Sequence, residues 1–159
     1  MSADLDQVGR VVMAGHYIIE ADGGSRGNPG PAAYGTVVRD GSDGRVVAEA
    51  AGYLGETTNN VAEYNGLVVG LQLVSRLDPS ATIEARLDSK LVVEQMSGRW
   101  KIKHPDMRQL ALQARNAFSP AQVTYTWVPR EQNKLADALV NESLDAVQFG
   151  ADGQIERLY

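Results

Sequence analysis

The sequence contains no cysteine and only two histidines among its 159 residues. The absence of cysteine excludes disulfide bonds, thiolate metal sites and a cysteine nucleophile. The histidines, His16 and His104, do not have the spacing of paired metal ligands, so we expect both on the surface. Any metal site in this chain would therefore consist of oxygen ligands, which favours Mg²⁺ or Mn²⁺ over zinc.

The sequence also lacks a hydrophobic run of the roughly 20 residues that a membrane span requires. Its first residues, MSADLDQVGRVVMAGH, carry acids early and have no long apolar stretch, so we expect no secretory signal and a cytoplasmic location. A length of 159 residues suits one domain with one core. We expect a loose lead-in over 1–15, the folded domain over 16–145 and a C-terminal tail over 146–159.

Positive charge is scarce overall but unevenly distributed. The net charge of −5 at first argues against a polyanionic partner. Residues 86–115, however, hold seven of the fifteen Lys and Arg residues against three acids. A locally basic face on an acidic protein is therefore compatible with binding to an anionic chain.

Hydrophobic periodicity predicts an alternation of strands and helices. Strands are expected over 17–22, 32–39, 45–54, 82–88 and 123–128, and helices over 58–77, 90–96, 105–118 and 133–144. Three strands in a row favour an antiparallel meander, and strands separated by helices favour parallel additions to the same sheet. The predicted fold is an α/β domain whose mixed five-stranded sheet has three antiparallel and two parallel strands, with helices on both faces. Trp127, on the last strand, is expected in the core.

Four acidic residues stand at corresponding places on four of these elements. Asp22 and Asp88 end two of the predicted strands, and Glu63 and Asp137 lie in the first turns of two predicted helices. Each acid alone is explained as a turn former or as a favourable charge at a helix start. If the two strands are parallel neighbours, however, both aspartates emerge at the edge where ligand sites of such sheets gather.

Electrostatics limits what such an acidic cluster can be. Two carboxylates about 5 Å apart repel by roughly 3 kcal/mol at an effective dielectric constant of about 20. Four of them would take up protons or move apart unless cations bind. Two divalent ions would neutralise four carboxylates, and ion pairs of this kind are used for in-line displacement at phosphorus. The pattern therefore predicts a metal-dependent site for phosphoryl chemistry.

Four motifs carry a resemblance to a known family. They read EADGGSRGNPGPAAYG, TTNNVAEYNGL, LDSKLVVEQMSG and WVPREQNKLADAL, and they occur in family order over about 17–145. The sequence resembles type 1 ribonuclease H, and within it the compact branch that lacks a basic handle. The resemblance implies an RNase H domain and hydrolysis of the RNA strand of RNA/DNA hybrids, with 5′-phosphate and 3′-hydroxyl products.

The same resemblance assigns roles to individual residues. It implies that Asp22, Glu63, Asp88 and Asp137 are metal-site carboxylates holding two Mg²⁺ ions, with Mn²⁺ as a possible substitute. The implied contacts to the hybrid come from Gly23, Asn28, Thr58, Asn59, Asn60, Ser89, Lys90 and Trp100. Bare backbone in the glycine-rich loop can approach the minor groove, where hybrids are recognised by shape and 2′-hydroxyls. For Trp100, anchoring a helix junction is an equally good explanation. We expect a monomer.

The sequence departs from the family pattern at two places. Many bacterial members carry a histidine in the loop before the last helix, whereas this chain reads VPREQNK. Arg130 is the stand-in, as a phosphate contact or leaving-group helper; it stays protonated and cannot act as a general base. A solvated loop cation is the alternative. Between Trp100 and Pro105 only KIKH replaces the basic helix, which predicts weaker and more salt-sensitive binding.

Three other functional classes remain to be compared. Integrases, transposases and junction resolvases share the fold and the acidic cluster, but the paired amides of TTNNVAEY favour a reader of RNA sugars. A hybrid-binding module without catalysis would lack a carboxylate, and none is missing. A nucleotide-binding phosphate loop would end in GK[ST] and precede a helix, whereas GGSRGNPG precedes a predicted strand.

Overall fold

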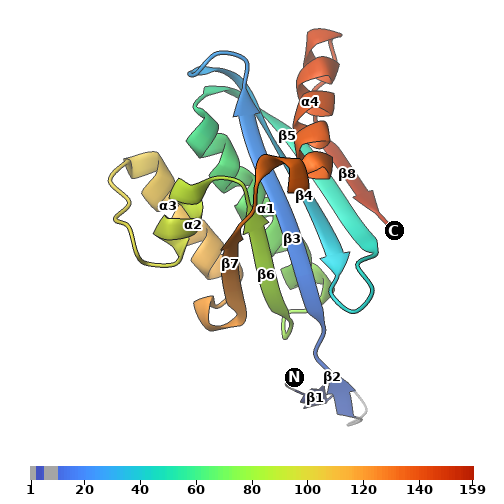
Figure 1. Cartoon of the computed structure of the whole chain (residues 1–159). Helices are drawn as coiled ribbons and strands as arrows, with labels where there is room; N and C mark the ends of the chain where they lie inside the picture. Colours follow the sequence, from blue (N-terminus) through green and yellow to red (C-terminus); the bar gives the residue numbers. More distant parts are fainter. Residues whose placement is uncertain (1–2, 6–10) are drawn as a thin grey trace.

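A six-stranded mixed sheet forms the centre of the molecule. The computed structural model describes residues 3–5 and 11–159, and the sheet has the strand order β7-β6-β3-β4-β5-β8 (Figure 1). Its strands are β3 (His16–Ser25), β4 (Gly30–Asp40), β5 (Val46–Thr57), β6 (Thr82–Leu87), β7 (Val123–Trp127) and β8 (Ile155–Leu158). The meander β3–β4–β5 is antiparallel, and β6 and β7 add in parallel beside β3. The predicted α/β class and the mixed sheet are confirmed.

The prediction of five strands is short by one. The segment predicted as a tail over 146–159 contains β8, which pairs antiparallel with β5 from Ala48↔Leu158 to Ala51↔Ile155. This strand has only four residues, two of them charged, so it carries too little hydrophobic alternation to be recognised. It forms because β5 offers it a free edge, a property that belongs to the assembled sheet.

The predicted lead-in over 1–15 is only partly described. Residues 1–2 and 6–10 lie outside the described residues, while β1 (Ala3–Leu5) and β2 (Val11–Met13) form a short antiparallel pair. Gly15, which precedes β3, donates its N–H to Asp78 Oδ2 at 2.8 Å. None of the described helices is long and apolar enough to cross a membrane.

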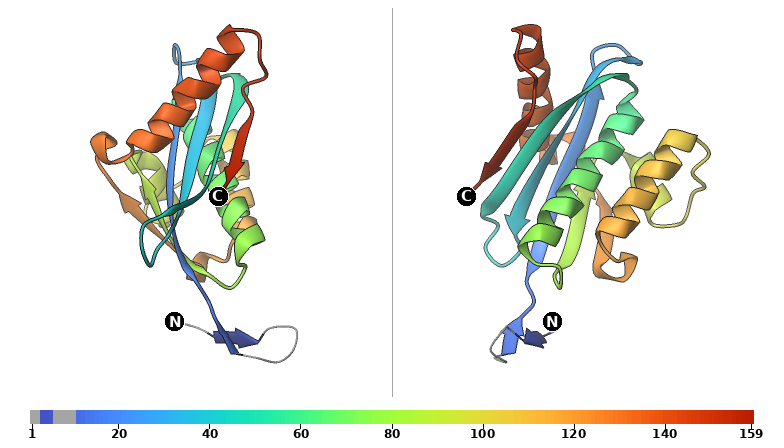
Figure 2. Two further views of the ribbon diagram at one scale, coloured as in Figure 1. Left: turned by 90° about the vertical axis from the view of Figure 1, so that its right-hand side faces the viewer. Right: turned by 180° about the vertical axis from the view of Figure 1, so that it is seen from behind.

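Helices cover both faces of the sheet, as predicted. α1 (Asn59–Leu77), α2 (Lys90–Met96) and α3 (Pro105–Ala117) lie on one side, and α4 (Lys134–Gln148) lies on the other (Figure 2). The main core fills the space between the sheet and α1, where Ile19, Tyr64, Leu67, Leu71 and Ile83 are almost fully buried. This two-sided arrangement brings the beginnings of α1 and α4 to the same end of β3 (Figure 1).

The start of α1 is determined locally. Thr58 is its N-cap, and the Thr58 hydroxyl accepts a hydrogen bond from the N–H of Val61. The helix ends at Asp78, next to Pro79, which cannot continue a helix in this position. Glu63 therefore lies in the second turn of a helix whose beginning is set by its own sequence.

α4 lies unusually close to the sheet because β4 has a glycine beneath it. A Cβ atom on Gly35 would lie 2.3 Å from the carbonyl oxygen of Ala136 and 2.9 Å from Cβ of Leu139. No side chain fits there without moving the backbone of α4. Because Ala136 immediately precedes Asp137, this close approach also determines how near that carboxylate comes to the end of β3.

Gly35→Ala should therefore destabilise the protein. The added methyl group would force α4 away from β4, and overpacking of this kind costs about 1–3 kcal/mol. Thermal or urea unfolding of the purified protein measures the loss. Gly24→Ala is the matched control, because a Cβ there would lie 3.5 Å from Val140 Cγ1, an ordinary contact. Equal unfolding midpoints for the two variants would contradict the proposed close packing.

Candidate active site

A polar cleft of about 420 Å³ opens at the carboxyl ends of β3 and β6. Its walls come from the ends of these strands, from the first turns of α1 and α4, from the N-cap of α2 and from the loop before α4. The lining residues are Asp22, Gly23, Gly24, Ser25, Asn59, Asn60, Glu63, Asp88, Ser89, Arg130 and Asp137. The cleft thus collects residues from all four sequence motifs.

Three of the predicted acids form one cluster. Asp22, Glu63 and Asp88 each offer a carboxylate oxygen, and these three atoms all lie within 4.8 Å of one another. The parallel register pairs Ala21 of β3 with Leu87 of β6, so the two aspartates that follow emerge side by side. Ser89, the next residue, caps α2 by accepting the N–H of Val92 and turns the chain away from the cleft.

Gly23 brings the third acid into the cluster. A Cβ atom on Gly23 would lie 2.2 Å from both the carbonyl carbon of Ala62 and the nitrogen of Glu63. The strand and the first turns of α1 are therefore in direct backbone contact, which a side chain would prevent. A glycine is thus needed after Asp22 so that α1 can pack directly against the end of β3. The predicted contact of Gly23 with a substrate stays a prediction.

Burial makes the cluster costly to ionise. Asp22 and Glu63 are each only 6% exposed, and Oε2 of Glu63 is buried without a hydrogen-bond partner among the described residues. Burial raises the pKa of Asp22 to about 7, and the charge of Asp88 adds to this. Burial and the neighbouring Asp22 together hold the pKa of Glu63 well above its usual range. A bound cation would offset both the cost of burying these carboxylates and their mutual repulsion.

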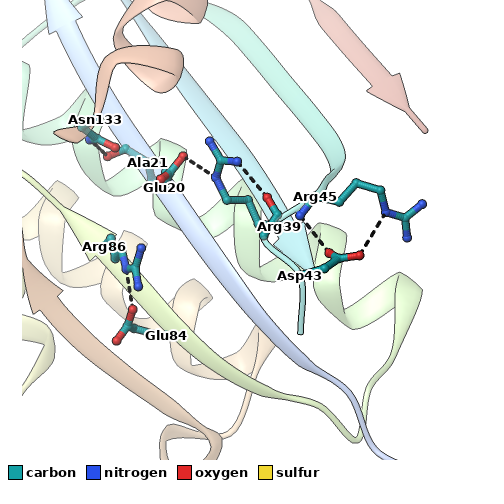
Figure 3. A network of polar contacts seen from close by, with 9 residues as sticks. Glu20, Ala21, Arg39, Asp43, Arg45, Glu84, Arg86 and Asn133 are labelled. Carbon is teal, nitrogen blue, oxygen red and sulfur yellow. Dashed lines mark hydrogen bonds and ion pairs between the residues drawn. The ribbon is translucent and has the colours of Figure 1, made fainter. Parts of the chain in front are cut away.

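Nearby acids outside the cleft are neutralised by arginines, in contrast to the cluster. Glu20, two residues before Asp22 on β3, is buried but accepts a hydrogen bond from Nε of Arg39 at 3.1 Å (Figure 3). Glu84 on β6 is likewise paired with Arg86. No ion pair within the described part of the chain involves Asp22, Glu63 or Asp88, so this concentration of charge is specific to the cleft.

Asp137 and Arg130 form a second, more open part of the site. Asp137 lines the same cleft from α4, but it does not belong to the tight group of three oxygens. Its Oδ1 lies 3.5 Å from Nη2 of Arg130, whose side chain is 78% exposed. Arg130 is the one cation among the described residues that line the cleft. It stands in the short 3₁₀ turn Arg130–Gln132 just before α4.

Asn133 holds this loop in place and was not singled out from the sequence. It is 1% exposed, and its Nδ2 donates to the carbonyl of Ala21, immediately before Asp22, at 2.8 Å (Figure 3). The N–H of Asp137 in turn donates to the carbonyl of Asn133. An Asn before a helix is normally an N-cap, but this side chain makes no cap bond. Only the fold shows that it links α4 to β3.

The amides predicted to read a substrate connect the glycine-rich loop to α1. Asn59 Oδ1 accepts hydrogen bonds from the N–H and the hydroxyl of Ser25 at 2.9 and 2.7 Å. The N–H of Asn59 donates to Oδ1 of Asn28 at 3.1 Å. Asn28 itself lies outside the lining of the cleft, in the exposed loop. The structure thus brings Asn28 and Asn59 together and places Asn60 beside them in the cleft wall.

The remaining predicted residues are more scattered. Thr58 caps α1, Lys90 is exposed at the start of α2, and Trp100 is exposed in the connection between α2 and α3. None of these three lines the cleft. The prediction that Trp127 is a core residue is wrong: it is 51% exposed, with its indole N–H donating to the carbonyl of Asp88 at 3.2 Å. It is exposed because β7 is an edge strand.

Comparisons with known proteins agree with this geometry. A family model described as "Reverse transcriptase-like" matches residues 20–143. Bifunctional protein Rv2228c of Mycobacterium tuberculosis is 55% identical over 84% of this chain and 37% of its own length. Ribonuclease HI of Halobacterium salinarum is 45% identical over 78% of this chain and 62% of its own length. The chain therefore spans between a third and two thirds of these relatives.

Two solved structures show the same fold at substantial identity. The N-terminal RNase H domain of the M. tuberculosis protein is 50% identical, with a TM-score of 0.78 over 87% of this chain and all of that domain. LC11-RNase H1 in complex with an RNA/DNA hybrid is 38% identical, with a TM-score of 0.77 over 83% of this chain and 99% of that one. Residues 20–143, which the family model matches, include every residue that lines the cleft.

Asp22→Asn should stabilise the protein at neutral pH when divalent ions are absent. A carboxyl whose pKa is about 3.9 unfolded and about 7 folded stabilises the fold below the lower value. That stability is lost as the pH rises toward 7. Removing the charge should therefore raise the unfolding free energy at pH 7.5 by on the order of 2 kcal/mol, since Glu63 shares the repulsion.

Thermal unfolding in EDTA at pH 5 and pH 7.5 measures this effect. The variant should gain stability at the higher pH and little at the lower pH. If the cluster holds Mg²⁺, adding the ion should raise the midpoint of the wild-type protein more than that of Asp22→Asn, because it would bind only the folded, ionised carboxylates. A variant that is less stable than wild type at pH 7.5 in EDTA would show that the carboxylates do not repel one another.

Proposed function

Since the chain belongs to the type 1 ribonuclease H family, we propose that it is an endoribonuclease that hydrolyses the RNA strand of RNA/DNA hybrids. The proposed products carry 5′-phosphate and 3′-hydroxyl ends. The observation that carries the proposal is the group of three carboxylate oxygens within 4.8 Å at the carboxyl ends of two parallel strands. The family relationship alone would leave activity open; the intact acidic cluster supports catalysis.

The donor set fits hard divalent cations. The ligands are carboxylates, and the buried Oε2 of Glu63 has no partner among the described residues. We propose that Asp22, Glu63, Asp88 and Asp137 hold two Mg²⁺ ions together with the substrate, with Mn²⁺ as a possible substitute. Such ions would supply an activated water and stabilise the leaving oxygen. The side chains hold the ligand oxygens in fixed positions, because three of them lie on rigid strand ends and helix turns.

Arg130 is proposed to contact the scissile phosphate or to assist the leaving group. Its exposed guanidinium lies 3.5 Å from Asp137, at the open side of the cleft, where an anionic chain would approach. It stays protonated at neutral pH, so it donates hydrogen bonds and does not remove a proton. In this position it also partly neutralises Asp137 before substrate binds.

Recognition of the hybrid is proposed to depend on small and amide side chains of the cleft wall. Gly23, Asn59, Asn60 and Ser89 line the cleft, and their small or amide side chains can approach sugars and 2′-hydroxyl groups. The proposed outer contacts are Asn28, Thr58, Lys90 and Trp100. Support comes from a relative of the same fold whose structure contains an RNA/DNA hybrid.

One chain supplies every residue of the cleft. This supports the proposal that residues 16–145 form the catalytic domain, and we further propose that the protein acts as a monomer. We also propose a cytoplasmic location.

The assay that tests this function compares three labelled duplexes. RNA/DNA hybrid, duplex RNA and duplex DNA of one sequence are incubated with the protein in Mg²⁺, in Mn²⁺ or in EDTA. We expect the RNA strand of the hybrid alone to be cut, and only with a divalent ion present. Cleavage of duplex DNA would instead indicate a junction-resolvase-like or integrase-like activity on the same fold.

Asp88→Asn should abolish hybrid cleavage while the fold stays intact. The amide keeps the shape of the side chain but removes one charge from the ligand cluster, and we expect a loss of at least about a hundredfold in kcat. Gel-resolved cleavage in Mg²⁺ measures it, and thermal unfolding checks the fold. Asp43→Asn is the matched control, since Asp43 lies exposed in the β4–β5 turn and should retain full activity. Wild-type rates in Asp88→Asn would refute the metal-site assignment.

A further inference from the structure

We propose that Arg26 is a positioning residue for the glycine-rich loop between β3 and β4, which is the proposed hybrid-binding loop. Its guanidinium joins that loop to the last turns of α4. This inference rests on the proposed function. A basic residue in a loop that faces a polyanion would ordinarily be interpreted as a phosphate contact. In this structure the side chain of Arg26 is already engaged by two residues of α4, which gives it a different role.

The contacts of Arg26 connect segments far apart in the chain. Its Nη2 lies 2.6 Å from Oδ1 of Asp145, and its Nη1 donates to Oε1 of Gln148 at 3.2 Å. Arg26 directly follows the last residue of β3, while both partners lie in the final turns of α4. The guanidinium therefore forms a bridge between the strand that carries Asp22 and the helix that carries Asp137.

Packing supports the same position for the side chain. Arg26 borders a small hollow of about 310 Å³ whose other walls are Pro31, Tyr53, Leu144, Val147 and Gln148. Most of this lining is apolar, so the alkyl stem of arginine can cover it while the charged end reaches the carboxylate. A short uncharged side chain such as alanine would lose both the cover of this hollow and the ion pair with Asp145.

The loop beyond Arg26 is folded tightly onto its backbone. The N–H of Arg26 donates to the carbonyl of Pro31 at 2.9 Å. A Cβ atom on Gly30 would lie 2.3 Å from the carbonyl oxygen of Arg26, so the chain returns across this residue without room for a side chain. Any displacement of Arg26 is therefore transmitted to Gly30 and to the intervening Asn28.

Two anchors thus hold the loop from opposite sides. On one side Asn28 Oδ1 accepts the N–H of Asn59 at the start of α1. On the other side Arg26 is held by Asp145 near the end of α4. Because α1 carries Glu63 and α4 carries Asp137, these two anchors fix the position of the loop relative to both acids. Loss of the second anchor should let the loop move and weaken binding without altering the cluster.

The two possible roles of Arg26 make opposite predictions for Asp145→Asn. If Arg26 is a phosphate contact, this variant frees the guanidinium, removes a repelling charge and strengthens hybrid binding. If Arg26 is a positioning residue, the variant releases the loop and weakens binding. The ion pair is partly exposed, with side chains 42% and 57% accessible, so the effect is modest. We expect KM to rise about two- to fivefold in Asp145→Asn and in Arg26→Ala.

The experiment measures kcat and KM on the labelled hybrid for wild type, Arg26→Ala, Asp145→Asn and the double variant. We expect kcat to stay within about twofold of wild type, and the double variant to show no higher KM than either single variant, because both remove the same interaction. Arg76→Ala and Glu156→Gln are the matched controls. They break a comparable exposed ion pair of 2.9 Å between α1 and β8, and should leave KM unchanged.

Three results would overturn the inference. The first is a KM that falls in Asp145→Asn, which would identify Arg26 as a phosphate contact. The second is a KM that stays at the wild-type value in both single variants, even if their thermal midpoints fall, because the bridge would then be purely structural. The third is additive increases in the double variant. A wild-type protein that cleaves no hybrid would instead refute the proposed function itself.

Discussion

The mutual repulsion of Asp22, Glu63 and Asp88 is the constraint on which the rest of the site depends. Three carboxylates within 4.8 Å, two of them almost fully buried, are unfavourable in a metal-free protein. The fold overcomes this repulsion because strand register determines the separation of the two aspartates and helix docking determines the place of the glutamate. Neither can relax without breaking backbone pairing or core packing. Core packing and strand pairing thus offset the repulsion between these charges and hold them in an arrangement that favours divalent cations.

Close contact between helices and the sheet makes this possible. Gly23 lets the first turns of α1 touch the end of β3, and Gly35 lets α4 lie directly on β4. Asn133 adds a buried hydrogen bond that joins the start of α4 to the same strand. Each contact involves backbone atoms, so the acidic residues are positioned by direct packing of helix and strand backbones. The glycine after Asp22 therefore has a packing role at the end of β3.

Much of the fold was predictable, because its signals are local. Periodicity located the long helix α1 and the parallel strand β6, and the Asp-Gly turn located the β4–β5 hairpin. The convergence of Asp22 and Asp88 followed from one assumption about strand order. What could not be predicted depends on the assembled sheet. β8 needs the free edge of β5, Trp127 is exposed because β7 is an edge, and the buried bond of Asn133 joins residues 112 positions apart. Such features have no signature within a short window of sequence.

The separation of the four acids into two groups has a further consequence. Asp137 is more accessible than Asp22 and Glu63, and it already has Arg130 as a partial counter-charge. Asp22, Glu63 and Asp88 have no ion-pair partner among the described residues, and the pKa values of the buried Asp22 and Glu63 are raised. A first cation should therefore relieve more repulsion in the buried group than near Asp137. In the proposed function, an anionic substrate would draw Arg130 toward itself and leave Asp137 unneutralised, which would favour a second cation on that side. If the proposed metal ions and hybrid bind in this cleft, their binding would be coupled through Arg130.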